Sequence, residues 1–281
     1  MRGRDHLKGK RLALPAGVAM RYATKLERLV RQMHGEVSRE LIALYHHPDV
    51  ETYLTENHVL AAMDISPSSQ ARILTNKLKE KFEQLFNAEG KPAAADMAGE
   101  ANQASASSTG ESLRAMGAKL SLDTSVISGA MREFTTAAIA RNVALIKSIP
   151  QEYFQRIQDA VFQSLTDGKG LEDLVPALQD IGGITERRAK NIAIDQTHKM
   201  YQGLNAGRMK NVGVKSFEWV HSGGGQHPRQ MHIDMSGKIY DFAHLPVIEE
   251  DGERGIPGQA INCRCTMIPV VRFEGEKDKA A

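Results

Sequence analysis

The sequence predicts an α+β protein: a mainly α-helical body followed by a small C-terminal α+β domain that contains a short antiparallel sheet. Two observations lead to this prediction. Up to residue 212, apolar residues recur at steps of three and four, the period of an amphipathic helix. From residue 214 the pattern changes to short alternating runs separated by glycine-rich turns, which is typical of strands.

The composition fits a globular protein of one large or two modest domains. The 281 residues are 41% hydrophobic, 25% charged and only 5% aromatic, which favours helices packed through aliphatic side chains. The formal net charge of +2 is small for a protein that coats DNA. We expect no signal peptide, because the apolar run near the basic N-terminus is too short, and no membrane-spanning helix.

Four consecutive segments are predicted from changes in composition. The N-terminal helical region covers 1–92, and an alanine-, serine- and glycine-rich segment covers 93–118. That segment can bury little surface, so we interpret it as a flexible linker or a loosely packed helix. The main domain is expected over 119–272, and a charged tail over 273–281.

The N-terminal region begins with a basic stretch, residues 1–16, which we interpret as a mobile solubilising arm. Contact of this arm with nucleic acid or with a partner is the alternative. The apolar period then predicts helices over 17–45 and 67–88, and the Ala88–Pro92 segment is expected to break the second one.

Helical patterning resumes over 119–165, with a joint predicted at Pro150. Two further helices are expected at 171–181 and 186–212. The residues Gly182–Thr185 separate them, since the glycine pair is suited to end one helix and the threonine to cap the next.

Three strand-like runs follow, at 214–221, 238–242 and 265–271. In the first run Phe217 and Trp219 alternate with polar residues and therefore share one face. These runs predict the short sheet of the C-terminal domain.

The helix expected at 186–212 carries six cations. They are Arg187, Arg188, Lys190, Lys199, Arg208 and Lys210. They are candidates for contact with nucleic-acid phosphates, which together with the basic N-terminus would make a DNA-binding module. A solvated helical face is the alternative interpretation.

Four sequence segments occur in an order that is typical of one protein family. They are Asn142–Pro150; Arg188-Ala189 leading to Asp195-Gln196; Gly213 followed by Trp219; and a tail block with Arg229, His232, Gly237, Phe242, Pro257-Gly258 and Cys263-Arg264-Cys265. This order resembles the Mu F-like family of phage minor head proteins, also called head morphogenesis proteins. The resemblance covers residues 140–271. In the loop after the tryptophan strand, this chain keeps Arg229 but lacks the acidic residue that the family often has.

The resemblance implies a minor capsid protein in the head of a tailed phage, assembled in the host cytoplasm. The partners that it implies are the portal protein, the major capsid or scaffold proteins at the inner capsid surface, and packaged double-stranded DNA. Such a protein acts in head assembly, DNA packaging or DNA ejection. It implies neither an enzymatic activity nor a membrane partner.

The tail block also concentrates side chains that bind metals. His227, His232, Cys263 and Cys265 suit a tetrahedral zinc site, with His221 as an alternative to His227. The Cys-x-Cys spacing is tighter than that of most zinc motifs, and it is near the limit for a disulfide bridge. Reduced thiols or metal ligands are therefore the two interpretations of the cysteines.

A structural role without a metal is another hypothesis for the same residues. Arg229, His232 and Arg264 would then hydrogen-bond the backbone of the Pro257–Cys265 loop, and the cysteines would be small buried side chains. Trp219 and Gly237 would contribute to the same small domain.

A third hypothesis is a hydrolase or nuclease in this block. It would use zinc with Asp234 or Asp241 as the base, or a cysteine nucleophile paired with His232. The sequence contains no HExxH, no nucleophile elbow and no phosphate-binding glycine loop, so the structural interpretation is preferred.

Overall fold

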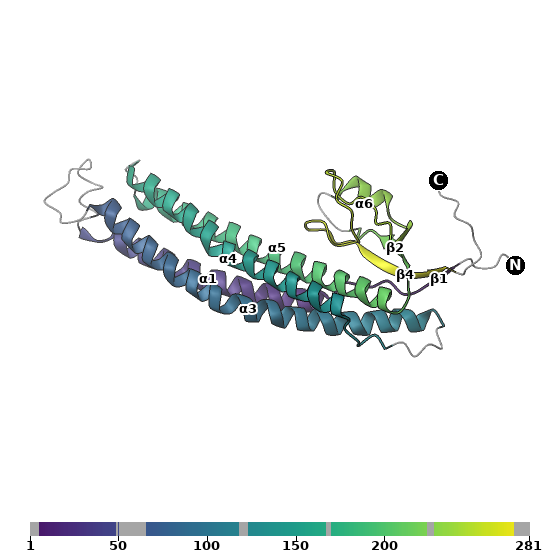
Figure 1. The fold of residues 1–281 in the computed structure, drawn as a ribbon. Helices are drawn as coiled ribbons and strands as arrows, with labels where there is room; N and C mark the ends of the chain where they lie inside the picture. The colour runs from purple at the N-terminus through teal and green to yellow at the C-terminus, as the bar shows by residue number, and fades with distance from the viewer. Residues whose placement is uncertain are drawn as a thin grey trace. The chain divides into compact units, whose positions relative to one another are not determined.

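The computed structural model describes residues 6–48, 50, 66–117, 123–166, 170–223 and 228–272. Its elements, in chain order, are β1 (His6–Lys8), α1 (Ala16–Tyr45), α3 (Pro67–Ala115), α4 (Gly129–Thr166), α5 (Leu171–Asn211), β2 (Ser216–Val220), α6 (Gln230–Asp234), β3 (Ile239–Asp241) and β4 (Thr266–Arg272). Among the described residues, four long helices lie between β1 and the other strands of a small antiparallel sheet (Figure 1), which confirms the predicted fold class.

The first predicted helix is confirmed with almost the same bounds, as α1. Its apolar residues at three- and four-residue steps face the core, because Leu26, Val30, Met33, Val37 and Leu41 have no exposed surface. The hydrophobic period alone therefore specifies both the helix and the face that it buries.

The predicted break at Ala88–Pro92 is wrong, because α3 continues through Pro92 to Ala115. Residues 93–115 of the alanine-, serine- and glycine-rich segment are helical, and several of their small side chains are buried. Ala94 and Ala101 have no exposed surface, and a Cβ added at Gly90 would lie 3.3 Å from Ile146 Cγ2. Small side chains let neighbouring backbones approach closely here, so a composition that resembles a linker forms a buried helix.

The predicted joints at Pro150 and at Gly182–Thr185 are also wrong, because both lie inside continuous helices. Pro150 is buried within α4, where packing outweighs the missing N–H donor. Gly182 allows a close approach, since a Cβ there would lie 2.6 Å from His34 Nε2. Thr185 does not cap a helix: its hydroxyl donates to the Ile181 carbonyl, one turn earlier, at 2.7 Å.

The sheet is antiparallel, with the strand order β1-β4-β2-β3. β2, β3 and β4 confirm the three predicted strands. At the centre of the sheet, Ser216 pairs with Asp241 on β3 and with Val270 on β4.

The interpretation of residues 1–16 as a mobile arm is wrong from residue 6 onward. His6–Lys8 forms the edge strand β1 on β4, and Leu12 is fully buried. The Leu12 amide donates to the Met267 carbonyl at 3.0 Å, and Arg11 Nε donates to Thr266 Oγ1 at 2.7 Å. A strand of three residues is too short to show an alternating pattern of apolar residues, and its partner β4 lies about 260 positions away in the sequence.

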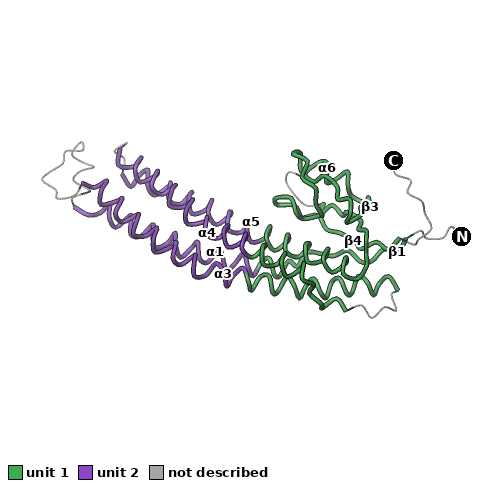
Figure 2. The backbone as a smooth tube through the Cα atoms, in the orientation of Figure 1, with its two compact units in different colours: residues 1–20, 95–139, 194–281 green, residues 21–94, 140–193 purple. Residues whose placement is uncertain are grey.

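The described chain forms two compact units, which Figure 2 colours separately. Unit 1 contains residues 1–20, 95–139 and 194–281, and unit 2 contains residues 21–94 and 140–193. Unit 1 holds the sheet, with a core that includes Phe217 and Trp219, whereas unit 2 is helical. The segment boundaries at residues 92, 118 and 272 remain predictions. Within the described residues, no helix is both long and apolar enough to cross a membrane.

Candidate metal centre

Three buried side chains from the predicted tail block converge in unit 1. His232 lies on α6, Cys263 lies in the loop before β4, and Cys265 directly precedes β4. The Nδ1 atom of His232 lies 3.4 Å from Cys263 Sγ and 3.8 Å from Cys265 Sγ. The exposed fractions are 3%, 5% and 2%, and the three donor atoms lie within 4.8 Å of one another. Cysteine sulfur and imidazole nitrogen are metal ligands, so this cluster can bind a metal.

The second ring nitrogen of His232 fixes the orientation of the imidazole. Its Nε2 donates to the Ile248 carbonyl at 3.0 Å, and the Trp219 ring packs against it with centroids 5.1 Å apart. Because a carbonyl can only accept, the proton of the neutral imidazole lies on Nε2. The Nδ1 lone pair therefore faces the two sulfur atoms.

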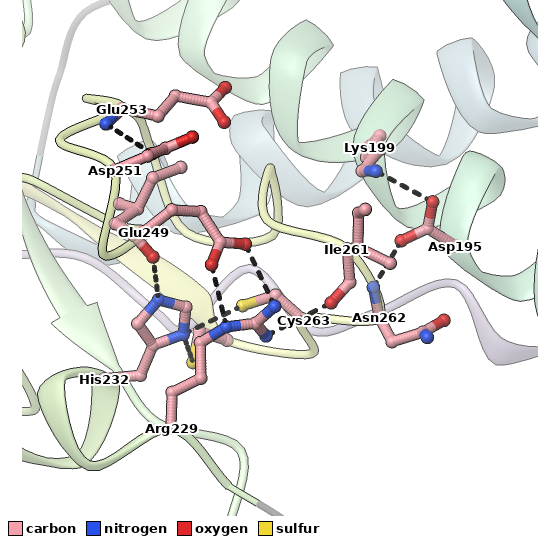
Figure 3. Close-up of polar contacts among 12 residues, drawn as sticks. Asp195, Lys199, Arg229, His232, Glu249, Asp251, Glu253, Ile261, Asn262 and Cys263 are labelled. Carbon is pink, nitrogen blue, oxygen red and sulfur yellow. Dashed lines mark hydrogen bonds and ion pairs between the residues drawn. The ribbon is translucent and has the colours of Figure 1, made fainter.

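Arg229 fixes the loops around the cluster (Figure 3). Its guanidinium donates two hydrogen bonds to Glu249, from Nε at 3.1 Å and from Nη2 at 2.9 Å. A third bond runs from Nη1 to the Ile261 carbonyl at 3.1 Å. Arg229 thus joins the residue before α6 to two loops and bonds the Pro257–Cys265 backbone at Ile261. His232 was predicted to bond the same loop, but its ring donates to the Ile248 carbonyl outside it.

Asp195 of α5 attaches the same loop to the helix. Its Oδ1 accepts the backbone N–H of Asn262 at 2.7 Å, and its Oδ2 pairs with Lys199 at 2.9 Å, as Figure 3 shows. Asn262 has a φ of 57°, a left-handed conformation that asparagine tolerates better than most residues. The Asp195 contact therefore helps to hold the residue before Cys263 in an unusual backbone conformation.

Two glycines of the predicted motif occupy turns with positive φ. Gly237, with φ 81°, donates from its amide to the Trp219 carbonyl at 2.8 Å. Gly258, with φ 89°, follows the buried Pro257, and a Cβ there would lie 2.9 Å from His198 Nε2. Both positions require glycine, the second one for its close approach to α5 as well as for its backbone.

The two cysteines titrate as a pair. The hydrogen bond from Cys265 lowers the pKa of Cys263 to about 4 despite its burial, and the bond with His232 lowers it further. The bond to Cys263, together with burial, raises the pKa of Cys265. Burial lowers the pKa of His232, but its bonds with Cys263 and with the Ile248 carbonyl raise it more, so the net shift is upward.

The other predicted residues of the tail block lie outside the cluster. His221 Nδ1 accepts the Gly223 amide at 3.2 Å, and His227 lies outside the described residues. Arg264 is exposed. The two candidate bases make local contacts only: Asp234 accepts from Gln230 on the same helix, and Asp241 accepts the Ala243 amide.

The six predicted phosphate-binding cations have different environments. Arg208 is 1% exposed and donates to the Thr124 carbonyl at 2.7 Å, so its guanidinium is not available to a phosphate. Arg188 pairs with Glu152 and Lys199 with Asp195. Arg187, Lys190 and Lys210 are exposed, and their contact with nucleic acid remains a prediction.

Sequence reasoning missed the groups that orient the cluster. Glu249 is one of several acidic residues in its loop, and nothing in the sequence marks it as the partner of Arg229. The Ile248 carbonyl is backbone, which no residue pattern can identify. Asp195 carried a signal, because it belongs to the Asp195-Gln196 motif, but its contact with Asn262 appears only in the folded chain.

Comparisons with known proteins agree with the resemblance found in the sequence. The family described as Phage Mu protein F like protein matches residues 155–268. An uncharacterized protein of Haemophilus influenzae (strain ATCC 51907 / DSM 11121 / KW20 / Rd) is 36% identical over 139 residues, which are 50% of this chain and 30% of that protein. The chain thus spans less than a third of the length of this relative. No solved structure matches the chain.

The matched residues contain every side chain of the cluster and the Arg229 and Asp195 contacts that hold it. Over residues 155–268, the chain is therefore similar to the family described as Phage Mu protein F like protein.

Proposed function

We propose that this protein is a minor capsid protein that acts in head morphogenesis of a tailed phage. The observation that carries the proposal is the family match over residues 155–268, which contains three of the four predicted motif segments, all but Asn142–Pro150. In this function the protein resides in the phage head and binds the portal protein, or the major capsid or scaffold proteins, during assembly in the host cytoplasm.

We infer a structural and not a catalytic role for the His232 cluster. The three donor side chains are buried, and their neighbours Arg229 and Asp195 bind loop backbone. Neither candidate base, Asp234 or Asp241, belongs to the cluster. The cofactor that we propose for the cluster is a structural zinc ion, which would stabilise the C-terminal domain without turnover.

Particle composition tests the assignment to the head. In the phage or prophage that encodes the chain, we expect mass spectrometry of purified particles to detect it at a few copies per particle. Deleting its gene should reduce infectious particles while the tail genes remain expressed. Absence of the chain from both finished particles and procapsids would contradict the proposal.

A pull-down distinguishes the proposed partners. Purified full-length chain is immobilised and offered the portal protein and the major capsid protein of the same phage separately. Retention of the portal protein alone supports a portal-associated position, and retention of the capsid protein alone supports the inner capsid surface. Retention of neither would contradict binding to these partners.

DNA contact is a finer part of the proposal, carried by the exposed cations Arg187, Lys190 and Lys210. We expect their combined substitution by alanine to weaken binding to double-stranded DNA and to reduce the salt dependence of the affinity. Fluorescence anisotropy at several salt concentrations measures both quantities. An affinity that is absent, or that does not depend on salt, would remove DNA from the set of partners.

A further inference from the structure

The distances within the His232 cluster are those of a metal site. In a tetrahedral zinc centre with Zn–S bonds of about 2.3 Å and Zn–N bonds of about 2.05 Å, sulfur and nitrogen ligands lie about 3.6 Å apart. The two observed nitrogen–sulfur distances, 3.4 Å to Cys263 and 3.8 Å to Cys265, lie on either side of this value. Both nitrogen–sulfur distances therefore fit ligands of one shared ion, and the three donor atoms lie within 4.8 Å of one another.

A buried donor packed against the cluster is unpaired. The Trp219 ring lies against the His232 ring, with centroids 5.1 Å apart. Among the described residues, the buried Trp219 Nε1–H has no hydrogen-bond partner. Buried polar groups without a partner are rare in folded proteins and are found beside functional sites and bound ions.

The imidazole is also held as in a metal site. A ligating histidine usually donates its remaining N–H to a carbonyl or carboxylate, which fixes the tautomer and directs the lone pair at the ion. His232 does this with the Ile248 carbonyl, and the next residue, Glu249, is held by Arg229. The acceptor of the imidazole proton is thus itself fixed by an ion pair.

We propose that His232 Nδ1, Cys263 Sγ and Cys265 Sγ bind one zinc ion, with Trp219, Ile248 and Arg229 as the groups that orient these ligands. Zinc binds cysteine as the thiolate, so the ion would neutralise two negative charges in a buried site. Three protein ligands leave one tetrahedral position for a further donor, such as water. These three atoms are the ligands of the structural zinc ion in the proposed function. The metal site itself does not depend on the assignment to the phage head.

Zinc content of the full-length chain is the first test. After purification and dialysis, we expect elemental analysis to find about one zinc per chain, and His232→Gln, Cys263→Ser and Cys265→Ser to lose it. His221→Gln is the matched control, because His221 lies in the same block but uses Nδ1 for the Gly223 amide. A folded wild-type chain that takes up no zinc when excess zinc is supplied would overturn the proposal. Retention of zinc by all three ligand variants would also overturn it.

Cobalt substitution keeps the proposal testable if a ligand variant does not fold. Co²⁺ added to the metal-free wild-type chain should give the intense visible bands of tetrahedral coordination and a thiolate-to-cobalt charge-transfer band. Trp219→Phe removes the indole N–H but no ligand, and we expect it to weaken metal affinity about 10-fold or more, as loss of an orienting group does. Octahedral cobalt bands without thiolate charge transfer in the wild-type chain would contradict the site.

The zinc site and the phage-head function can be contradicted independently of each other. A chain that binds zinc through these residues but never enters particles would contradict the proposed function and leave the metal site intact. A chain that enters particles without zinc would contradict the metal site alone.

Discussion

The two compact units differ in how they satisfy buried polar groups. Among the described residues of unit 2, the buried polar side chains are those of Thr75, Asn142, Ser164 and Thr185. The three hydroxyl groups all donate to a carbonyl within the preceding helical turn, and Ser164 Oγ in addition bonds the Tyr45 hydroxyl of α1. In unit 1 the buried polar side chains include the ionisable residues Asp195, His198, Arg208 and His232. These side chains form hydrogen bonds with backbone groups that are distant in the sequence. Arg208, for example, donates to the Thr124 carbonyl.

The two units therefore depend on different features of the sequence: unit 2 on the period of its apolar residues, and unit 1 on specific polar partners. A helix whose polar groups bond within one turn needs only the apolar period to choose its buried face. A buried ionisable side chain needs partners at defined positions, because an unpaired polar group in the core costs free energy. Unit 2 should therefore respond most to loss of apolar volume, and unit 1 to loss of individual polar bonds.

The largest expected effect tests the apolar core of unit 2. Phe82 has no exposed surface and stacks on Phe154, with ring centroids 6.4 Å apart. Phe82→Ala should lower the free energy of unfolding by about 3–5 kcal/mol, since it removes buried surface and leaves a cavity. Urea denaturation followed by circular dichroism measures the loss. Phe162→Ala is the control: this side chain is 66% exposed, and its loss should cost less than about 0.5 kcal/mol.

The next effect tests the polar core of unit 1. Arg208 donates to the Thr124 carbonyl at 2.7 Å, to Ser105 Oγ at 3.0 Å and to Asn102 Oδ1 at 2.7 Å. Arg208→Met keeps much of the volume but leaves these acceptors without their donor, so we expect a loss of about 2–4 kcal/mol by urea denaturation.

The control for this substitution is Lys190→Met, which replaces an exposed cation on the same helix and should change stability by less than about 0.5 kcal/mol. If the Arg208 variant and the wild type had the same free energy of unfolding, the buried polar network would not stabilise unit 1. The proposed difference between the units would then be wrong.

A smaller effect isolates the close approach of the Pro257-Gly258 turn to α5. Gly258 and Gly252 have nearly the same φ, 89° and 91°, but only Gly258 has a neighbour, since its Cβ would lie 2.9 Å from His198 Nε2. Alanine at either position should cost about 1–2 kcal/mol for the backbone conformation. At Gly258 we expect about 1 kcal/mol or more in addition, from the clash. Melting temperatures of the two variants give the comparison, and equal losses would show that the turn has room to move.

The smallest effect is the pH dependence of unit 2. Burial lowers the pKa of His34 below 6.5, although the charge of Glu186 opposes this shift. The unfolded chain therefore binds a proton at His34 more readily than the folded chain, so this residue reduces stability as the pH falls below about 6.5. His34→Gln should lose less stability than the wild type between pH 7 and pH 5, as measured by urea denaturation at each pH. A larger acid-induced loss in the variant would reverse the assigned direction.

Predictions made from the period of the apolar residues were confirmed, whereas predictions made from single turn-forming residues were wrong. The apolar period identified α1, and the change to alternation identified three strands of the sheet. The predicted breaks at Pro92, Pro150 and Gly182 were wrong. Proline and glycine favour turns in an isolated chain, but they can also lie inside long helices that pack closely together. Local propensity is weaker than the burial gained when helices of this length pack together.

Residue types and their spacing were sufficient to predict the fold class, the helical period and the motif residues Arg229, His232, Cys263 and Cys265. The folded chain was needed to show that His232 directs Nδ1 at both sulfur atoms, that Arg229 pairs with Glu249, and that Arg208 is buried. The same holds for the edge strand at residues 6–8. These outcomes depend on backbone carbonyls and on partners far away in the chain, and contacts of that kind leave no period in the sequence that could predict them.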